Sequence, residues 1–140
     1  MMHKLVIAGR LPSLNEFILA DRTSKYGSNA MKRDAQELIS WQIKQQLDGV
    51  KIEKPVFIQF RWYAENKKTD PDNISGYGRK LILDSLVKCG ALKGDGWKWI
   101  VGFADLFDVD RENPRAELLM SEAEEYYPRP IGVLLRGGDR

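Results

Sequence analysis

The spacing of apolar residues predicts four strands, of which the clearest covers residues 56–65. In this segment a set of apolar side chains alternates with a second, more polar set; the apolar set is Val56, Ile58, Phe60, Trp62 and Ala64. A period of two residues is that of an extended chain, whose successive side chains point to opposite faces of a sheet. Shorter runs of β-branched and aromatic residues predict three further strands, at residues 5–8, 97–109 and 116–120.

Apolar residues at a spacing of three or four predict a long helix over residues 31–47. The positions are Met31, Ala35, Leu38, Ile39, Ile43 and Leu47. Ser28 is a candidate N-cap, and Gly49 follows as the residue that ends the helix. The preceding residues, 11–29, contain Pro12 and several Ser, Asn and Gly residues, and are therefore predicted to form a loop.

A second helix is predicted over residues 79–88, followed by Gly90 as its stop. Gly76 and Gly78 disfavour an earlier start, because glycine is among the poorest helix formers. Two main helices and a small mixed or antiparallel sheet make the predicted fold class α+β.

Length and composition suit one domain. A chain of 140 residues with 43% hydrophobic residues can bury a real core. We assign the domain to residues 1–120, and residues 121–140 have the composition of a tail, acidic first and then rich in Pro, Gly and Arg. Every apolar run is shorter than the roughly 18 residues of a membrane-spanning helix, so we expect a cytoplasmic protein without membrane contact.

The rarity of cysteine and histidine narrows the available chemistry. Cys89 is the single cysteine and His3 the single histidine. This excludes an intrachain disulfide and a zinc site built mainly on thiolates. A metal site would therefore rest on carboxylates and would take a hard cation such as Mg²⁺ or Mn²⁺.

Basic residues are concentrated in the first hundred positions. Residues 1–100 hold 17 Lys and Arg against 11 Asp and Glu, a net charge of +6, whereas residues 101–140 carry −4. A basic body suits a polyanion such as nucleic acid, and a solvated mixed surface gives the same count. The candidates for contact with a phosphate backbone are Lys25, Lys32, Arg33, Arg61, Lys67 and Lys68.

The most informative segment is Asp70-Pro71-Asp72-Asn73, between the strand at 56–65 and the helix at 79–88. Side chains two positions apart in an extended chain point to the same side, so both carboxylates can converge on one ion. Pro71 favours this geometry, because it pushes the preceding residue toward extended dihedral angles. The alternative is a turn in which Asp72 or Asn73 caps the following helix.

A third carboxylate, Asp95, lies between Gly94 and Gly96. On its own it is a typical turn aspartate. The helix at residues 79–88 could carry the chain back beside Asp70, in which case three carboxylates would share one site with nearby cations. That mixture suits phosphate chemistry, because carboxylates hold the metal and cations contact the phosphate oxygens.

Three ordered segments of the chain resemble the RusA family of Holliday junction resolvases. They are Asp70-Pro71-Asp72-Asn73-Ile74, Lys80-Leu81-Ile82-Leu83-Asp84-Ser85-Leu86 and Gly90-Ala91-Leu92-Lys93-Gly94-Asp95. The wider resemblance covers roughly residues 5–120 and includes Leu11-Pro12-Ser13-Leu14-Asn15, Met31-Lys32-Arg33, Gly102-Phe103 and Asn113-Pro114-Arg115. Its specificity lies in the ordered set of segments rather than in any one motif.

The resemblance implies a small homodimeric α+β endonuclease that cuts four-way DNA junctions with Mg²⁺, in DNA recombination and repair. Carried over by position, the metal-binding and catalytic aspartates would be Asp70, Asp72 and Asp95. The family's catalytic lysine would be Lys80. Members of this family are common in phages and prophages.

The chain departs from the family pattern at two places. Gly94 stands where the family often has an additional acid before the third aspartate. Between Asn73 and Lys80 the chain has about four more residues than some members, which makes Arg79 a rival for the lysine's role and a further candidate for nucleic-acid binding.

A dimer is also expected from the reaction, because resolving a junction takes two symmetrical nicks and a two-fold dimer has two sites. Residues 97–103 are a candidate interface strand, with ordinary core as the alternative. The same residues fit two other functions: a metal-dependent nuclease for flaps, forks or structured RNA, and a non-catalytic nucleic-acid-binding module.

Overall fold

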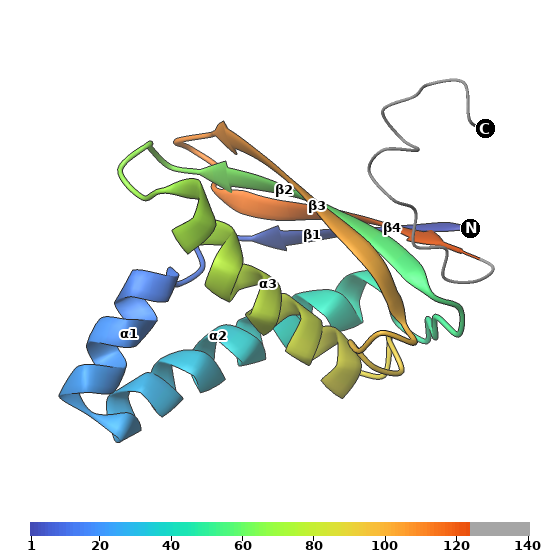
Figure 1. Ribbon diagram of the computed structural model, residues 1–140, viewed down its shortest axis with the longest axis horizontal. Helices are drawn as coiled ribbons and strands as arrows, with labels where there is room; N and C mark the ends of the chain where they lie inside the picture. Colours follow the sequence, from blue (N-terminus) through green and yellow to red (C-terminus); the bar gives the residue numbers. More distant parts are fainter. Residues whose placement is uncertain (124–140) are drawn as a thin grey trace.

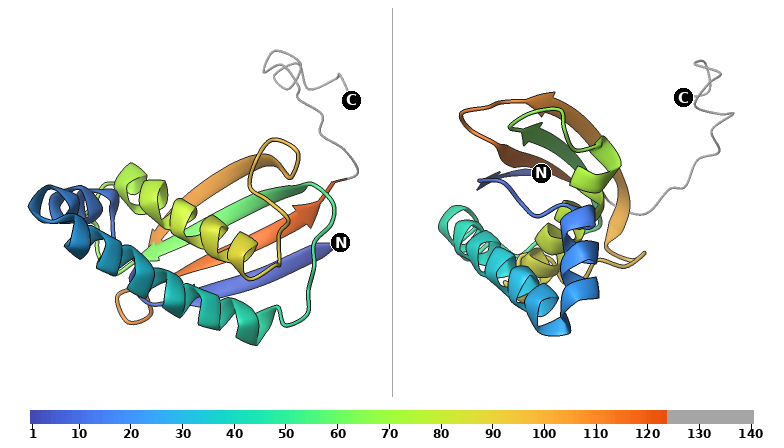
Figure 2. Two further views of the ribbon diagram at one scale, coloured as in Figure 1. Left: turned by 90° about the horizontal axis from the view of Figure 1, so that it is seen from below. Right: turned by 90° about the vertical axis from the view of Figure 1, so that its left-hand side faces the viewer.

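The structure, a computed structural model, describes residues 1–123, in which three helices lie on one face of a four-stranded sheet (Figures 1 and 2). The open face of the sheet is turned away from the helices (Figure 2). In chain order the elements are β1 (Met2–Ala8), α1 (Leu14–Thr23), α2 (Lys25–Gln46), β2 (Val56–Ala64), α3 (Pro71–Lys88), β3 (Ile100–Val109) and β4 (Arg115–Glu122).

The sheet is mixed, with the strand order β1-β4-β2-β3. Strand β4 is antiparallel to both β1 and β2, whereas β3 is parallel to β2 and is reached through α3. The predicted α+β class with a mixed sheet is confirmed. The prediction of two main helices is wrong, because residues 1–123 form three. Strands β1 and β3 are the two edges of the sheet.

The core lies between the sheet and helices α2 and α3. Strand β2 confirms the predicted alternation, since Val56, Ile58, Phe60 and Trp62 are all buried. Buried side chains from the other elements complete this core: Leu5 and Ile7 on β1, Leu118 and Met120 on β4, Ile39 and Ile43 on α2, and Leu81, Ile82 and Leu86 on α3.

The predicted loop at residues 11–29 is in fact mostly helical, and it contains α1. Ser13 caps α1: its Oγ accepts a hydrogen bond from the Glu16 backbone N–H, and the Glu16 carboxylate accepts one from the Ser13 N–H. This reciprocal pair is a capping box, which the spacing of Ser13 and Glu16 could have indicated. Helix α2 begins at Lys25 with Ser24 as its cap, rather than at Ser28 as predicted.

Replacing Ser13 with alanine should lower the free energy of unfolding by about 1 kcal/mol, because the Glu16 backbone N–H loses the Ser13 Oγ that accepts its hydrogen bond. Ser13 is buried, so water cannot easily replace its hydroxyl. Chemical denaturation at 25 °C measures this loss. The matched control is Ser24→Gly, which should cost only a few tenths of a kcal/mol at the cap of α2. Equal losses from both variants would contradict the capping box.

Helix α3 begins at Pro71, eight residues before the predicted start. Gly78 lies inside it because the Trp62 ring packs there: a Cβ at this position would come within 2.7 Å of Trp62 Cζ3. The glycine is therefore required by packing rather than by a break in the helix. The predicted stop is confirmed at Gly90, whose φ of +82° is left-handed.

The remaining strands differ from prediction mainly at their ends. Strand β1 begins at Met2, and β3 begins at Ile100 because residues 97–99 form a turn. Strand β4 reaches Glu122, so it includes the first two residues of the predicted tail. The rest of that tail, residues 124–140, lies outside the described residues. In the part of the chain that is described, no helix has the length and apolar character needed to cross a membrane.

Candidate functional site at the start of helix α3

Asp70 and Asp72 lie at the N-terminal end of α3. Asp70 is the N-cap, with extended dihedral angles (φ −64°, ψ 147°), and its side chain makes no capping hydrogen bond. Pro71 occupies the first helical position, where its missing N–H leaves no donor unsatisfied. The extended geometry expected for the pair therefore holds for Asp70 only, and the cap is neither Asp72 nor Asn73.

Both carboxylates are exposed and have no bonding partner in the described part of the chain. Across residues 1–123, neither Asp70 nor Asp72 takes part in a hydrogen bond or an ion pair. They stand at the positive end of the α3 dipole, which stabilises negative charge there. Two carboxylates held on a rigid helix start, without a structural partner, are available to bind a cation.

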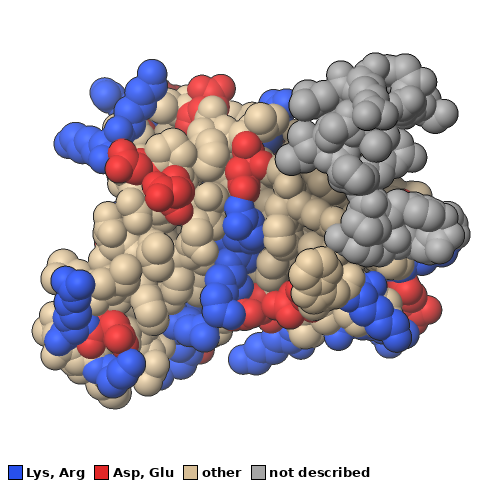
Figure 3. Space-filling view, viewed as in Figure 1, with Lys and Arg blue, Asp and Glu red and all other residues tan. Residues whose placement is uncertain are grey.

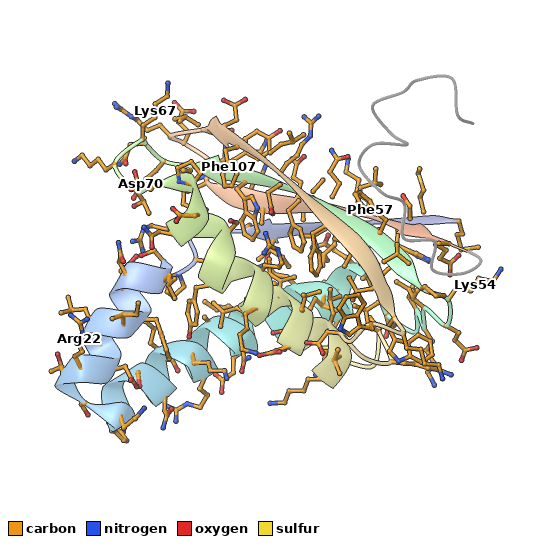
Figure 4. The ribbon with its side chains drawn as sticks, viewed as in Figure 1. Arg22, Lys54, Phe57, Lys67, Asp70 and Phe107 are labelled. Atoms are coloured by element: carbon orange, nitrogen blue, oxygen red, sulfur yellow. The ribbon has the colours of Figure 1, made fainter. Side chains whose placement is uncertain are left out.

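Cationic side chains precede this pair on the turn between β2 and α3. Lys67 and Lys68 are both exposed, and Figure 4 shows Lys67 at the same end of the molecule as Asp70. Asn66 fixes the turn, because its Oδ1 accepts a hydrogen bond of 2.9 Å from the Lys68 backbone N–H. The site therefore presents anionic and cationic groups side by side on one surface.

A cleft adjoins the pair and contains two arginines that sequence analysis had given no role. It is formed by the loop after β1, the end of β2, the start of β4 and the start of α3, and its lining includes Arg10, Arg115, Thr69 and Ile74. Arg10 is bonded to Glu16 and lies 3.5 Å from Glu65 Oε1. The spacing of residues in the sequence could not have predicted that both arginines line one cleft, because Arg10 follows the end of β1 and Arg115 begins β4.

Arg115 is held firmly in this cleft by acids. It donates to Asp110 Oδ2 and to Glu117 Oε2, both at 2.8 Å, and lies 3.8 Å above the centre of the Tyr63 ring. Hydrogen bonds from Arg115 and then from the Asn113 backbone hold the pKa of Asp110 below its usual range. The same two acids raise the pKa of Arg115. The guanidinium is thus a fixed charge that stays protonated.

Asp95 does not lie beside Asp70. It follows the C-terminal end of α3, an 18-residue helix that spans about 27 Å at 1.5 Å per residue. Its loop is bonded to the first residue of β2 and to the segment before it: the Val56 N–H donates to the Trp99 carbonyl at 2.9 Å, and Lys93 Nζ lies 3.7 Å from Glu53 Oε1. Asp95 is therefore near the beginning of β2, whereas Asp70 follows the end of that strand.

The expectation that α3 returns the chain to Asp70 is thus not met within one copy. Figure 4 shows this separation, with Asp70 at one end of the molecule and Lys54, just before β2, at the other. No group of three metal-ligating side chains is found among residues 1–123. In one copy Asp70 and Asp72 lie two residues apart at the start of α3, and Asp95 is exposed elsewhere.

The structure separates the roles of Arg79 and Lys80. Arg79 forms an ion pair with Asp105 on β3, and its guanidinium carbon lies 5.0 Å from the Phe103 ring centre. The Trp62 indole N–H donates to the same carboxylate at 2.9 Å. Arg79 is therefore used to hold α3 against the sheet, and it is not a free phosphate-binding group.

Lys80 is 63% exposed and lies 3.4 Å from Asp84, one turn further along α3. Exposed pairs of this kind are weak, so its ammonium group can exchange partners. It lies about 12 Å along the helix axis from Asp72, since eight residues separate the two. Of the two candidates for contact with the scissile phosphate, Lys80 is therefore the one whose charged group is exposed and weakly paired.

Replacing Arg79 with alanine should lower the free energy of unfolding by about 2 kcal/mol, because Asp105 is mostly buried and would lose its main partner. Denaturation at 25 °C measures the change. The double variant Arg79→Ala/Asp105→Ala should recover part of the loss, since it leaves no unpaired charge. A single-variant loss that equals the small effect of Lys80→Ala would contradict a structural role for Arg79.

Lys32 and Arg33 lie away from the carboxylate pair. They line a groove between α2 and the C-terminal end of α3, together with Lys44, Lys88 and other residues of α2. Tyr77, in the first half of α3, stacks on Phe17 with the ring centres 4.6 Å apart. Burial, and then the charge of Asp84, raise the pKa of its hydroxyl. Tyr77 joins α3 to α1.

Comparison with known proteins adds no relative: no family model matches this chain, and no curated protein is significantly similar to it.

Proposed function

We propose that this protein is a metal-dependent, structure-specific endodeoxyribonuclease of the RusA type, which resolves four-way DNA junctions. One observation carries the proposal. At the start of α3, Asp70 and Asp72 form no hydrogen bond or ion pair within residues 1–123, and they follow the exposed cations Lys67 and Lys68. A structural helix start would use its N-cap side chain to bond a backbone N–H. Here Asp70 does not.

In the proposed reaction, Asp70 and Asp72 hold Mg²⁺ or Mn²⁺ through oxygen atoms only, which suits both ions. An ion held there would supply Lewis acidity for phosphodiester hydrolysis. Lys67 and Lys68 position the DNA backbone on the turn, and Lys80 stabilises the additional negative charge on the scissile phosphate.

The position of Asp95 supports a homodimer whose sites are shared between copies. The edge strand β3 exposes large apolar side chains, namely Phe103, Leu106, Phe107 and Val109, each at least 39% exposed. A long apolar edge strand readily pairs with another chain. Two copies of β3 paired antiparallel would place the beginning of one β3 beside the end of the other.

This pairing would bring the third carboxylate to the site. Asp95 precedes β3 by a short turn, and the end of β3 lies next to the end of β2, where Ala64 pairs with Val109. Asp70 follows that end of β2. Asp95 of a second copy would therefore approach Asp70 and Asp72 of the first, which gives two symmetrical sites for two nicks.

A cleavage panel tests the proposed activity. The substrates are a four-way junction, a fork, linear duplex DNA and structured RNA, each with Mg²⁺ and with excess chelator. We expect paired symmetrical nicks in the junction with Mg²⁺ and none with chelator, because unshielded carboxylates repel each other and the phosphate. Preferred cutting of forks or RNA would replace the proposed substrate. Binding without cutting of any substrate would identify a nucleic-acid-binding module instead.

A further inference from the structure

A basic groove between α2 and the C-terminal end of α3 has no role in the proposed reaction. Its lining includes four cations, Lys32, Arg33, Lys44 and Lys88, and one acid, Glu37. Figure 3 shows Lys and Arg side chains spread over the lower part of the molecule, where α2 and the end of α3 lie. The groove is at the opposite end of α3 from Asp70, so it is a separate surface.

The cations of this groove are largely free of acidic partners. Within residues 1–123, Lys32, Lys44 and Lys88 form no ion pair. Arg33 lies 3.7 Å from Asp34, and both side chains are more than half exposed. Since exposed pairs contribute little, Arg33 can also contact an anion. The groove therefore presents a positive surface that attracts anionic ligands.

The polar residues of α2 that line the groove form one stripe along the helix. Asn29, Lys32, Gln36, Ser40 and Lys44 follow one another at intervals of three or four residues. From Asn29 to Lys44 the stripe is about 22 Å long at 1.5 Å per residue. That length corresponds to about six nucleotides of a stacked strand at 3.4 Å each.

Trp41 adds an aromatic surface to this stripe. Its side chain is 63% exposed, although it lines the groove beside Lys44. In the described part of the chain the indole has no ring partner and no cation above it. Trp41 is one of three large side chains that α2 exposes, with Tyr26 and Leu38, whereas Ile39 and Ile43 are buried in the core. The core therefore does not explain why Trp41 lies in the groove.

From these observations we infer that the α2–α3 groove binds single-stranded DNA. Cations that follow the backbone, together with an exposed aromatic ring on which a base stacks, are the features by which proteins bind unpaired strands without sequence preference. A duplex offers no free base face to Trp41, which is why the unpaired strand is the ligand that these residues fit. This inference does not rest on the proposed nuclease function, because the groove needs neither Asp70 nor a metal.

Fluorescence anisotropy with the full-length protein and a labelled oligonucleotide of twelve thymidines tests the inference. Trp41→Ala should weaken binding by about tenfold, the loss expected for one stacked base. Lys44→Ala and Lys88→Ala should each make the logarithm of the binding constant less dependent on the logarithm of salt, by about 0.7 per lost phosphate contact. Leu38→Ala is the matched control, since Leu38 is 67% exposed on α2 but outside the groove.

Three results would overturn the inference: no binding of the oligonucleotide by the unaltered protein, equal affinity for Trp41→Ala and Leu38→Ala, or equal losses by Trp41→Ala for the single strand and for a duplex of the same length. If the unaltered protein cleaves no substrate of the panel but Trp41→Ala still weakens binding of the oligonucleotide, the nuclease function is rejected and the groove is retained. If the unaltered protein cleaves the junction but Trp41→Ala does not weaken binding of the oligonucleotide, only the groove is rejected.

Discussion

Asp70→Asn and Asp95→Asn should each abolish junction cleavage when tested alone, and a mixture of the two variants should recover cutting of one strand. The physical reason is the distance of about 27 Å that α3 places between these residues in one copy. If each site takes Asp70 from one copy and Asp95 from the other, a mixed dimer has one site with both defects and one site with neither. Only the intact site cuts.

The measurement is a nicking assay on a four-way junction labelled on one strand at a time. Each variant alone should lose at least about 100-fold in rate, since even residues that merely support metal ligands cost ten- to 100-fold. Differently tagged copies, denatured together and refolded, give the mixed dimer after two affinity steps. Asp48→Asn, an exposed acid at the end of α2, is the matched control and should cut at the normal rate.

Each alternative arrangement gives a different pattern. If the mixed dimer is as inactive as its parents while both single variants fail, each site lies within one copy and the shared-site arrangement is wrong. If Asp95→Asn cuts as fast as Asp48→Asn, Asp95 is not part of the site. Junction binding by Asp70→Asn should persist or tighten, because removal of a carboxylate relieves repulsion of the phosphate.

Local patterns in the sequence predicted those helices and strands whose spacing of apolar residues reflects one buried face. The alternation at residues 56–65 follows from one buried and one less buried face of β2. The spacing at residues 31–47 follows from the face of α2 that meets the core, except at Leu38, which is 67% exposed. The carboxylate pair was also predictable, because Asp70 and Asp72 are close in the chain. Helix α1 was missed although Ser13 and Glu16 carried its capping signal.

The placement of Asp95 could not be predicted from local pattern, because it depends on the length of α3. With a start at residue 79 the second helix would be ten residues long, which leaves enough free chain for Asp95 to return toward Asp70. The true start at Pro71 adds about 12 Å of rigid helix and separates them. Similarly, Arg79 could not be assigned, because its partner Asp105 lies 26 residues away and meets it only through tertiary packing.

Gly76→Ala and Gly78→Ala should change stability in opposite directions, although both replace glycine inside the same helix. Alanine is favoured over glycine in a helix by about 1 kcal/mol. At Gly76 the nearest side-chain atom to a new Cβ is Leu14 Cδ2 at 3.8 Å, an ordinary contact, so Gly76→Ala should raise the free energy of unfolding by up to that amount. Gly76 is therefore the matched control for Gly78.

At Gly78 the new Cβ would lie 2.7 Å and 2.9 Å from two atoms of the Trp62 ring. That ring cannot easily move, because its N–H bonds to Asp105 at 2.9 Å and its plane stacks on Phe60 at 5.2 Å. Overpacking of this kind costs about 1 to 3 kcal/mol, which exceeds the gain in helix propensity. Gly78→Ala should therefore lower the free energy of unfolding by about 1 kcal/mol or more.

Denaturation of both variants at 25 °C measures the difference, and the Trp62→Leu background identifies its cause. With the large ring removed, Gly78→Ala should no longer clash and should become stabilising, as Gly76→Ala is in either background. A Gly78→Ala variant that stabilises the unaltered chain as much as Gly76→Ala does would show that Trp62 does not pack on α3 at this position. The Trp62–Gly78 contact would then not be one of those that hold α3 against the sheet, and the Arg79–Asp105 ion pair would remain as such a contact.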